Sequence, residues 1–290
     1  MIVESINILI SAMLMGGIYA LIAVGLSLQY GVARVFNISH GEFIMLGAFI
    51  TWSLYTIFNI NPLLSLVISG PLIFLAGFVL HKTLYRSIYV SSGGSTAVFE
   101  GNSMLASFGL LFIIQNLAIM LWGADIKGYS FLAYTLDLGG FVFPANRIVA
   151  LFFAIAISVA FYLFLGRTRL GKAIRAAAQD AAAAELMGVN IKQVLALCFG
   201  FGTLMAGLAG VLLSMSFPIN PLMGLDYTLI AIIVVVLGGL GSIPGSFVGG
   251  FILGLIGSIV SAIEPGLVMV AFYLIFMILL LVKPAGILGR

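Results

Sequence analysis

Long apolar stretches separated by short breaks constrain the fold of this chain more than any other sequence feature. Most are close to the roughly 20 residues that an α-helix needs to cross the hydrocarbon core of a bilayer. The breaks carry glycine, proline, asparagine or charged residues, which interrupt helices. The predicted spans are residues 6–30, 38–57, 62–81, 103–122, 147–165, 193–216, 227–240, 246–263 and 266–282. We therefore expect an all-α polytopic membrane protein with eight or nine transmembrane helices.

The composition indicates the same class of protein. Only 7% of the residues are charged and 63% are hydrophobic, whereas a soluble domain has about 25% charged residues. So few charges cannot cover the surface of a soluble fold, and lipid must therefore face much of the chain. We expect one transmembrane domain over residues 1–290, with no soluble domain and no enzyme activity of its own.

Two of the predicted spans differ from an ordinary membrane helix. The span 38–57 starts with two ionisable residues, His40 and Glu42. The span 227–240 has only about 14 residues, roughly 20 Å of helix. Either could be re-entrant or broken, and for this reason the expected number is eight or nine.

The basic residues orient these spans in the membrane. Nine spans place the two chain ends on opposite sides, and ten of the twelve Lys and Arg residues fall on one side. They are Arg34, Lys82, Arg86, Arg167, Arg169, Lys172, Arg175, Lys192, Lys283 and Arg290. Only Lys127 and Arg147 fall on the other. Because cytoplasmic loops are enriched in basic residues, we expect a cytoplasmic C-terminus, an outside N-terminus and an outside loop at 123–146.

The longest polar, helix-prone stretch is the predicted cytoplasmic loop 166–192. Its residues 170–186 contain eight alanines, which are strong helix formers, and Gly188 suits a helix C-terminus. We expect one helix with a flat, small-residue face that docks in a groove of a partner protein; the alternative is a helix lying on the lipid headgroups. The residues of this face are Leu170, Ile174, Ala177, Ala181 and Ala184.

Residues 166–173 of this loop, GRTRLGKA, nearly match the phosphate-binding pattern G-x-x-x-x-G-K-[ST]. Ala173 lacks the hydroxyl that would hold Mg²⁺, and the segment follows a membrane span instead of a strand. We therefore expect no nucleotide site in this chain.

Asn37, His40 and Glu42 lie at a break that the predicted topology places on the cytoplasmic side. We expect a hydrogen-bonded turn that caps the next helix. A proton relay would need further acids deeper in the membrane, and no predicted span has an acid near its middle. With two His residues and one cysteine, Cys198, the sequence shows no catalytic set and no metal-ligand cluster.

Small residues recur at four-residue spacing in two spans, a pattern that lets membrane helices approach closely. The positions are Gly202, Ala206 and Gly210 in one span, and Gly250, Gly254 and Ser258 in the other. We interpret both stripes as tight helix packing or as a sliding surface of a gated pathway.

Three stretches of the chain resemble the membrane permease subunits of branched-chain amino acid ABC importers, of the LivH type. Residues 25–49, GLSLQYGVARVFNISHGEFIMLGAF, carry the Asn-x-x-His-Gly-Glu core of that family. Residues 167–194 are similar to its cytoplasmic coupling loop, and residues 236–250, VLGGLGSIPGSFVGG, to its glycine-rich signature. The positions that match the coupling loop include Gly171, Arg175, Ala178, Asp180, Ala184 and Gly188.

The resemblance implies a transmembrane subunit of an ATP-driven importer that works by alternating access in a bacterial or archaeal plasma (inner) membrane. It implies three kinds of protein partner and contact with membrane lipid, and it implies no nucleic acid. The partners are a second related permease, two ABC ATPase subunits, which bind the ATP and Mg²⁺ that this chain does not, and a periplasmic or extracellular substrate-binding protein. We place the translocation pathway near Asn37, His40, Glu42, Gly238, Gly239 and Gly241.

One departure from the family pattern leaves the substrate open. Before the glycine signature the family often has a basic residue followed by Ala-Phe, and here the run is Asp226-Tyr227-Thr228. Branched-chain amino acids (Leu, Ile, Val) are the main expectation, with urea or short amides as alternatives within the family. A passive small-solute channel would leave the loop 166–192 without a role, and a secondary transporter should show intramembrane charge pairs.

Overall fold

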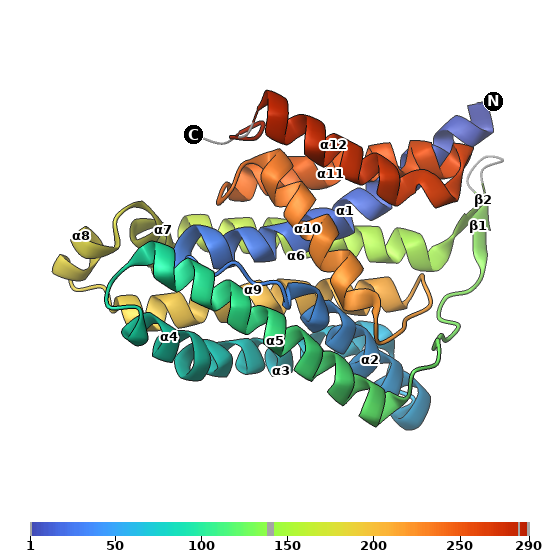
Figure 1. Ribbon diagram of the computed structural model, residues 1–290. Helices are drawn as coiled ribbons and strands as arrows, with labels where there is room; N and C mark the ends of the chain where they lie inside the picture. Colours follow the sequence, from blue (N-terminus) through green and yellow to red (C-terminus); the bar gives the residue numbers. More distant parts are fainter. Residues whose placement is uncertain (1, 138–141, 284, 289–290) are drawn as a thin grey trace.

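The computed structural model describes residues 2–137, 142–283 and 285–288, and these residues form a long bundle of helices (Figure 1). The long apolar helices are α1 (Ile2–Ala33), α2 (His40–Phe58), α3 (Pro62–Leu80), α5 (Thr96–Trp122), α6 (Ala145–Arg167), α9 (Ile191–Ser214), α11 (Ile243–Ile263) and α12 (Val268–Val282). The shorter helices are α4 (Arg86–Ser91), α7 (Arg169–Gln179), α8 (Ala181–Leu186) and α10 (Met223–Gly238). A π turn, η1 (His81–Tyr85), and a 3₁₀ turn, η2 (Pro265–Leu267), join consecutive helices, and β1 (Thr135–Asp137) pairs antiparallel with β2 (Val142–Pro144).

The expected all-α membrane architecture is confirmed. Eight helical segments within the described residues are long and apolar enough to cross a membrane, and α10, with 16 residues, is shorter. The segments at α2 and α10 are the two that the sequence marked as unusual. The start of α1 and the end of α12 lie at opposite ends of the bundle, as an odd number of passes requires (Figure 1).

The turn residues that the sequence marked end the helices by identifiable bonds. Asn59 adopts a left-handed conformation after α2, and the Asn61 side chain accepts a hydrogen bond from the Leu63 N–H at the start of α3. Ser95 and Ser242 cap α5 and α11 in the same way. These caps satisfy N–H groups that have no partner within their own helix.

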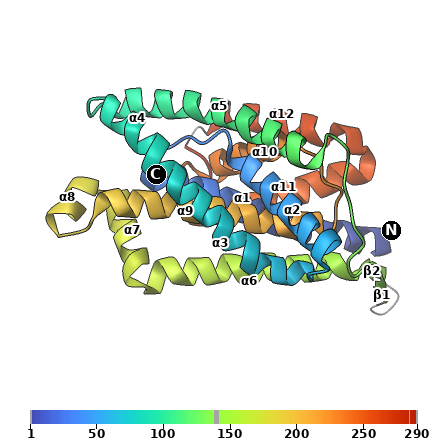
Figure 2. The ribbon, with the colours of Figure 1, turned by 90° about the horizontal axis from the view of Figure 1, so that it is seen from below.

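Helices α1 and α9 form the centre of the bundle and are buried over most of their length, whereas α12 is almost entirely exposed. Figure 2 shows α1 and α9 between α5 and α6. The two small-residue stripes lie at this centre. A Cβ atom on Gly250 or Gly254 would collide with the α1 backbone, and one on Gly210 would collide with the Ile44 carbonyl of α2. Glycine at these positions therefore allows backbone-to-backbone packing.

The connection between the third and fourth spans differs from the prediction. Residues 82–102 were expected outside the spans, but α3 continues through η1 into α4, and only residues 92–95 form the turn before α5. The π turn is fixed by Tyr85, which is fully buried with its ring centroid 4.7 Å from that of Phe199. Tertiary packing of this aromatic residue extends the helix beyond the apolar stretch.

The segment between α5 and α6, predicted as the outside loop, is bound to the ends of the neighbouring helices. The Tyr55 hydroxyl donates a hydrogen bond to the Ser130 carbonyl (2.9 Å), and the Tyr55 and Tyr129 rings lie 4.8 Å apart. Lys127 pairs through its backbone with Ile219, between α9 and α10. The loop therefore covers the end of the bundle opposite α7 and α8 (Figure 1).

The side of the membrane on which each end lies can be tested by cysteine labelling, because the native Cys198 is fully buried. A cysteine placed at Ser91 or Ala182, both exposed, should react with a membrane-impermeant maleimide only after permeabilisation of the cells. A cysteine at Ala133, also exposed, should react in intact cells. Labelling of Ala182→Cys in intact cells would contradict the predicted orientation and would place α8 outside the cell.

Candidate functional site

The polar segment after α1 lies inside the bundle. At Arg34, which has a φ of 54°, the chain turns back from the end of α1, and residues 34–39 run toward the middle of the bundle before α2 begins (Figure 1). The Ile38 N–H donates to Ser107 Oγ (3.0 Å) in the interior of α5. His40 lies 3.1 Å through Nε2 from the Ile22 carbonyl. Ile22 is 11 residues before the end of α1, roughly 16 Å along the helix.

A buried side chain of α1, Gln29, holds this segment in place. Its Oε1 accepts a hydrogen bond from Asn37 Nδ2 (3.1 Å) and lies 3.2 Å from His40 Nδ1, while its Nε2 donates to the Phe199 carbonyl (3.3 Å). Both ring nitrogens of His40 therefore face oxygen atoms, and a neutral imidazole can donate a proton to only one of them. Sequence reasoning missed Gln29, although it is an amide within an otherwise apolar stretch.

The first turn of α2 contacts the first turn of α10. The Gly41 N–H donates to Thr228 Oγ1 (2.8 Å), and a Cβ atom on Gly41 would collide with the Gly224 carbonyl. The Glu42 carboxylate lies against the Cα of Gly224, is fully buried, and neither of its oxygens has a hydrogen-bond partner among the described residues. A helix N-terminus favours negative charge, and Leu222, which precedes α10, provides no side-chain cap.

The predicted hydrogen-bonded turn before α2 is present, since the His40 N–H donates to the Asn37 carbonyl (3.3 Å), but Asn37, His40 and Glu42 are buried within the bundle. Glu42 stands in the first turn of α2, away from the middle of the helix, and it is buried inside the bundle. The sequence did not predict this burial, because the apolar pattern marks where a helix breaks but carries no information about how deeply the break is buried. An intramembrane ionisable residue is a functional-site candidate by default.

The three predicted pathway glycines lie in the turn between α10 and α11. Gly238 packs against Gly245, and Gly239 and Gly241 have φ angles of +106° and +79°. The Cα of Gly241 lies beside Gly31 in the last turns of α1. The glycines and the Gln29 network thus contact α1 two residues apart, at Gly31 and Gln29.

The predicted coupling loop forms two helices instead of one. The chain breaks at Asp180, which is extended (φ −153°) and accepts the Ala183 N–H at 2.9 Å, so that it caps the start of α8. Gly188 follows α8 with a φ of +86°, as a helix C-terminus requires. The expected single helix over 170–186 is therefore wrong, because an Asp side chain that binds the backbone competes with helix continuation.

The alanine face predicted for docking packs mostly on the chain itself. Ile174, Ala177 and Ala184 are buried, and Leu170 is half-buried. Gly171 is also buried, so close to Leu165 that a Cβ atom would collide with its backbone. Of the predicted coupling residues, Arg175, Ala178, Asp180 and Gly188 are exposed. Amphipathic spacing identified a real apolar stripe, but the stripe covers α1 and α9.

The exposed apolar surface of this loop is instead at its tip. Leu186 and Met187 are 90% and 85% exposed, at the extreme end of the bundle (Figure 1). Sequence reasoning treated them only as the last residues before Gly188. Their position outside the bundle, at the basic-rich end, makes them candidates for contact with another protein.

Nothing in the described part of the chain gathers three or more His, Cys, Asp or Glu side chains that could hold a metal. The arrangement of helices and polar groups defines a class of protein. Helices that begin inside a membrane bundle, with ionisable groups at the break, are typical of proteins that move solutes across membranes. The fold and the site thus define a multi-pass membrane transport protein.

Comparisons with known proteins identify its family. The sequence profile described as "Branched-chain amino acid transport system / permease component" matches residues 8–282. The permease protein BraD of a high-affinity branched-chain amino acid transport system in Pseudomonas aeruginosa is 32% identical, over 97% of this chain and 95% of that protein. LivH, the permease protein of a high-affinity branched-chain amino acid transport system in Escherichia coli K12, is 30% identical, over 95% of this chain and 92% of that protein. The chain belongs to this permease family.

A solved structure supports the fold. PsaBC from Streptococcus pneumoniae, in complex with a Fab, matches with a TM-score of 0.50 and 12% identity, covering 95% of this chain and 91% of that chain. At this identity the likeness concerns the fold alone.

Because α2 and α10 touch at Gly41, adding one methyl group at this position should lower the stability of the protein. Gly41→Ala should destabilise the protein by about 1–3 kcal/mol, because the new Cβ forces α10 away from α2. Gly109→Ala is the matched control, since no atom lies within 4 Å of its Cβ position, and it should leave the stability unchanged or slightly raised. Thermal unfolding of the detergent-solubilised protein measures both, and equal melting temperatures for the two variants would contradict the contact.

Proposed function

We propose that this chain is the transmembrane permease subunit of an ATP-driven importer of branched-chain amino acids. The observation that carries the proposal is the family match over residues 8–282, together with relatives named for branched-chain amino acid transport from both Pseudomonas aeruginosa and the archaeon Methanocaldococcus jannaschii. Energy comes from two separate ATPase subunits that bind ATP and Mg²⁺. The chain itself performs no catalysis.

The proposed orientation places α7, α8 and the end of α12 in the cytoplasm of a bacterial or archaeal cell. The basic residues gathered at this end support it. The ATPase subunits then bind the loop 166–192, and a substrate-binding protein delivers its load at the opposite end, where the outside loop and β1 and β2 lie (Figure 1). A second related permease completes the membrane part.

The route from α8 to the membrane centre consists of direct contacts. Through Asp180, α8 is joined to α7, and α7 packs on α1 and α9. Those two helices carry Gln29 and Phe199, which hold the segment before α2. A displacement of α8 therefore reaches the contact between α2 and α10 through three packed elements.

Alternating access follows if the contact between α2 and α10 is made in one state and broken in the other. Glu42 would then exchange its position at the α10 N-terminus for a more polar environment. The ATPase can drive this change only by binding the loop differently in the two states.

Reconstitution tests the proposed substrate. Proteoliposomes that contain this permease, its partner permease, the ATPase subunits and the binding protein should show ATP-dependent uptake of L-leucine. Excess L-isoleucine or L-valine should compete, and urea should not. ATP-dependent uptake of urea or acetamide without uptake of leucine would contradict the proposal, as would leucine uptake without ATP.

The tip of the loop should be the apolar anchor of the ATPase. Replacing Leu186 and Met187 together with serine should weaken ATPase binding by about tenfold or more, because burial of each side chain contributes about 1.5–3 kcal/mol. Both side chains are exposed in the permease, so the fold should be unaffected. Co-purification of the ATPase and substrate-stimulated ATP hydrolysis are the measurements.

The matched control for this variant is Ile126→Ser with Tyr134→Ser, two exposed apolar residues of the outside loop. It should retain both co-purification and hydrolysis. Normal substrate-stimulated ATP hydrolysis in the Leu186/Met187 variant would show that these two side chains are not part of the surface that binds the ATPase.

A further inference from the structure

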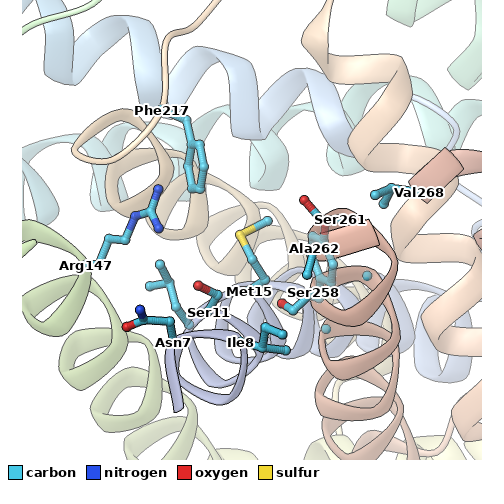
Figure 3. A pocket seen from close by; sticks show the side chains of 14 residues that line it. Asn7, Ile8, Ser11, Met15, Arg147, Phe217, Ser258, Ser261, Ala262 and Val268 are labelled. Atoms are coloured by element: carbon cyan, nitrogen blue, oxygen red, sulfur yellow. The ribbon is translucent and has the colours of Figure 1, made fainter. Parts of the chain in front are cut away.

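A cavity distinct from the α2–α10 contact opens at the end of the bundle opposite α7 and α8. Its volume is about 360 Å³, within the range of about 300–1,000 Å³ that is usual for small-molecule sites. It lies between the first half of α1, the last turns of α11 and the start of α6, beside Phe217 (Figure 3). Polar residues line the cavity at the start of α6 and at the end of α11, and apolar residues line the space between these two walls.

The first polar wall carries positive charge. Arg147 stands in the first turn of α6, with its Cζ 5.6 Å from the centroid of the Phe217 ring (Figure 3). The described residues that line the cavity include no carboxylate to neutralise it. Pro144, which precedes α6, provides no side-chain cap, so the partial positive charge of the helix N-terminus adds to that of the guanidinium.

The second polar wall carries partial negative charge. Ser258, Ser261 and Ala262 line the cavity from the last turns of α11, which ends at Ile263. A helix C-terminus leaves carbonyl groups without intrahelical partners. The Ser261 carbonyl has none because the residue four positions further on, Pro265, has no N–H. These carbonyls and the two serine hydroxyls are acceptors for a cationic donor.

Apolar side chains separate the two polar walls. Ile8 and Met15 lie between them, Val268 lies beyond Ser261, and Asn7 and Ser11 add polar groups on the side of Arg147 (Figure 3); Leu14 also lines the cavity. The cavity therefore offers, in one small volume, a site for an anion, a site for a cation and an aliphatic surface.

We propose that this cavity binds a zwitterionic aliphatic amino acid on its way into the permease. The carboxylate pairs with Arg147 at the start of α6, the ammonium group binds the carbonyls and hydroxyls at the end of α11, and the side chain lies on Leu14 and Met15. The choice of an aliphatic amino acid rests on the proposed function. An anionic phospholipid headgroup, such as that of phosphatidylglycerol, shares only the anionic part of this chemistry, and the partial negative wall at α11 disfavours it.

Ligand analogues test each wall separately. The assembled importer, without its binding protein, is placed in phosphatidylcholine nanodiscs, and binding of L-leucine, L-leucinamide and 4-methylpentanoate is measured by displacement of tritiated L-leucine. Arg147→Gln should weaken L-leucine binding by about tenfold or more, the effect expected for a lost charge-assisted pair. L-Leucinamide lacks the carboxylate, so it should bind the wild type weakly and lose nothing further in the variant.

Further variants distinguish loss of the binding site from loss of the folded protein. Ala262→Phe fills the cavity from an exposed position and should abolish binding while Arg147 is intact, whereas Ala262→Ser should retain it. Lys127→Gln removes the other basic residue of this side of the protein, which lies over the Trp52 ring, and should bind L-leucine as the wild type does.

The proposal is overturned if Arg147→Gln weakens L-leucine and L-leucinamide equally, if Ala262→Phe binds normally, or if the wild type does not bind L-leucine. It is also overturned if phosphatidylglycerol in the nanodiscs displaces L-leucine in an Arg147-dependent manner, which would assign the site to lipid. Leucine uptake by the complete importer is measured in parallel. Uptake that persists in Arg147→Gln rejects the site and leaves the proposed function intact, and absence of uptake in the wild type rejects both.

Discussion

The structure depends on hydrogen bonds that a non-helical segment makes inside a membrane bundle. A bilayer offers no water to backbone N–H and C=O groups, so irregular backbone is tolerated there only where protein provides partners. Ser107 supplies one for Ile38, Thr228 one for Gly41, and the α1 side chain Gln29 binds the side chains of Asn37 and His40. These partners come from three different helices, so the segment can exist only when the bundle is assembled around it. The break before α2 is therefore a product of the whole fold.

The same requirement explains why glycine occurs where helices begin and cross. Gly41 and Gly224 bring the first turns of α2 and α10 together, and Gly250 and Gly254 bring α11 onto α1. Backbone contacts of this kind have no flexible side chain between them to absorb a displacement. A packed interior changes between discrete arrangements more readily than it deforms continuously, which suits a protein that must be open to one side of the membrane at a time.

Hydropathy and turn chemistry predicted most of the fold. The helix boundaries at Asn59, Pro62, Ser95 and Pro244 follow from local rules, because a cap or a proline acts on its own neighbours. The depth of the break at residues 34–39 does not follow from such rules, since Ser107 lies 69 residues away from its partner. The same is true of the 166–192 loop, where periodicity identified an apolar face but not the helices that cover it. Leu186 and Met187 lie where α8 ends, and only the assembled bundle shows that the described residues leave both side chains uncovered.

Asp180 gives the loop a mechanical property that a continuous helix would lack. A straight rod of 17 residues would transmit any push along its axis unchanged. Two short rods joined at one extended residue form a lever, and the direction of the motion delivered to the bundle is set by the angle at the joint. The Asp180 side chain caps the start of α8 by accepting the Ala183 N–H, so one carboxylate stabilises the second rod at the joint. The direction in which α8 leaves the bundle therefore depends on one residue at the joint, while the packing of the long helices does not involve it.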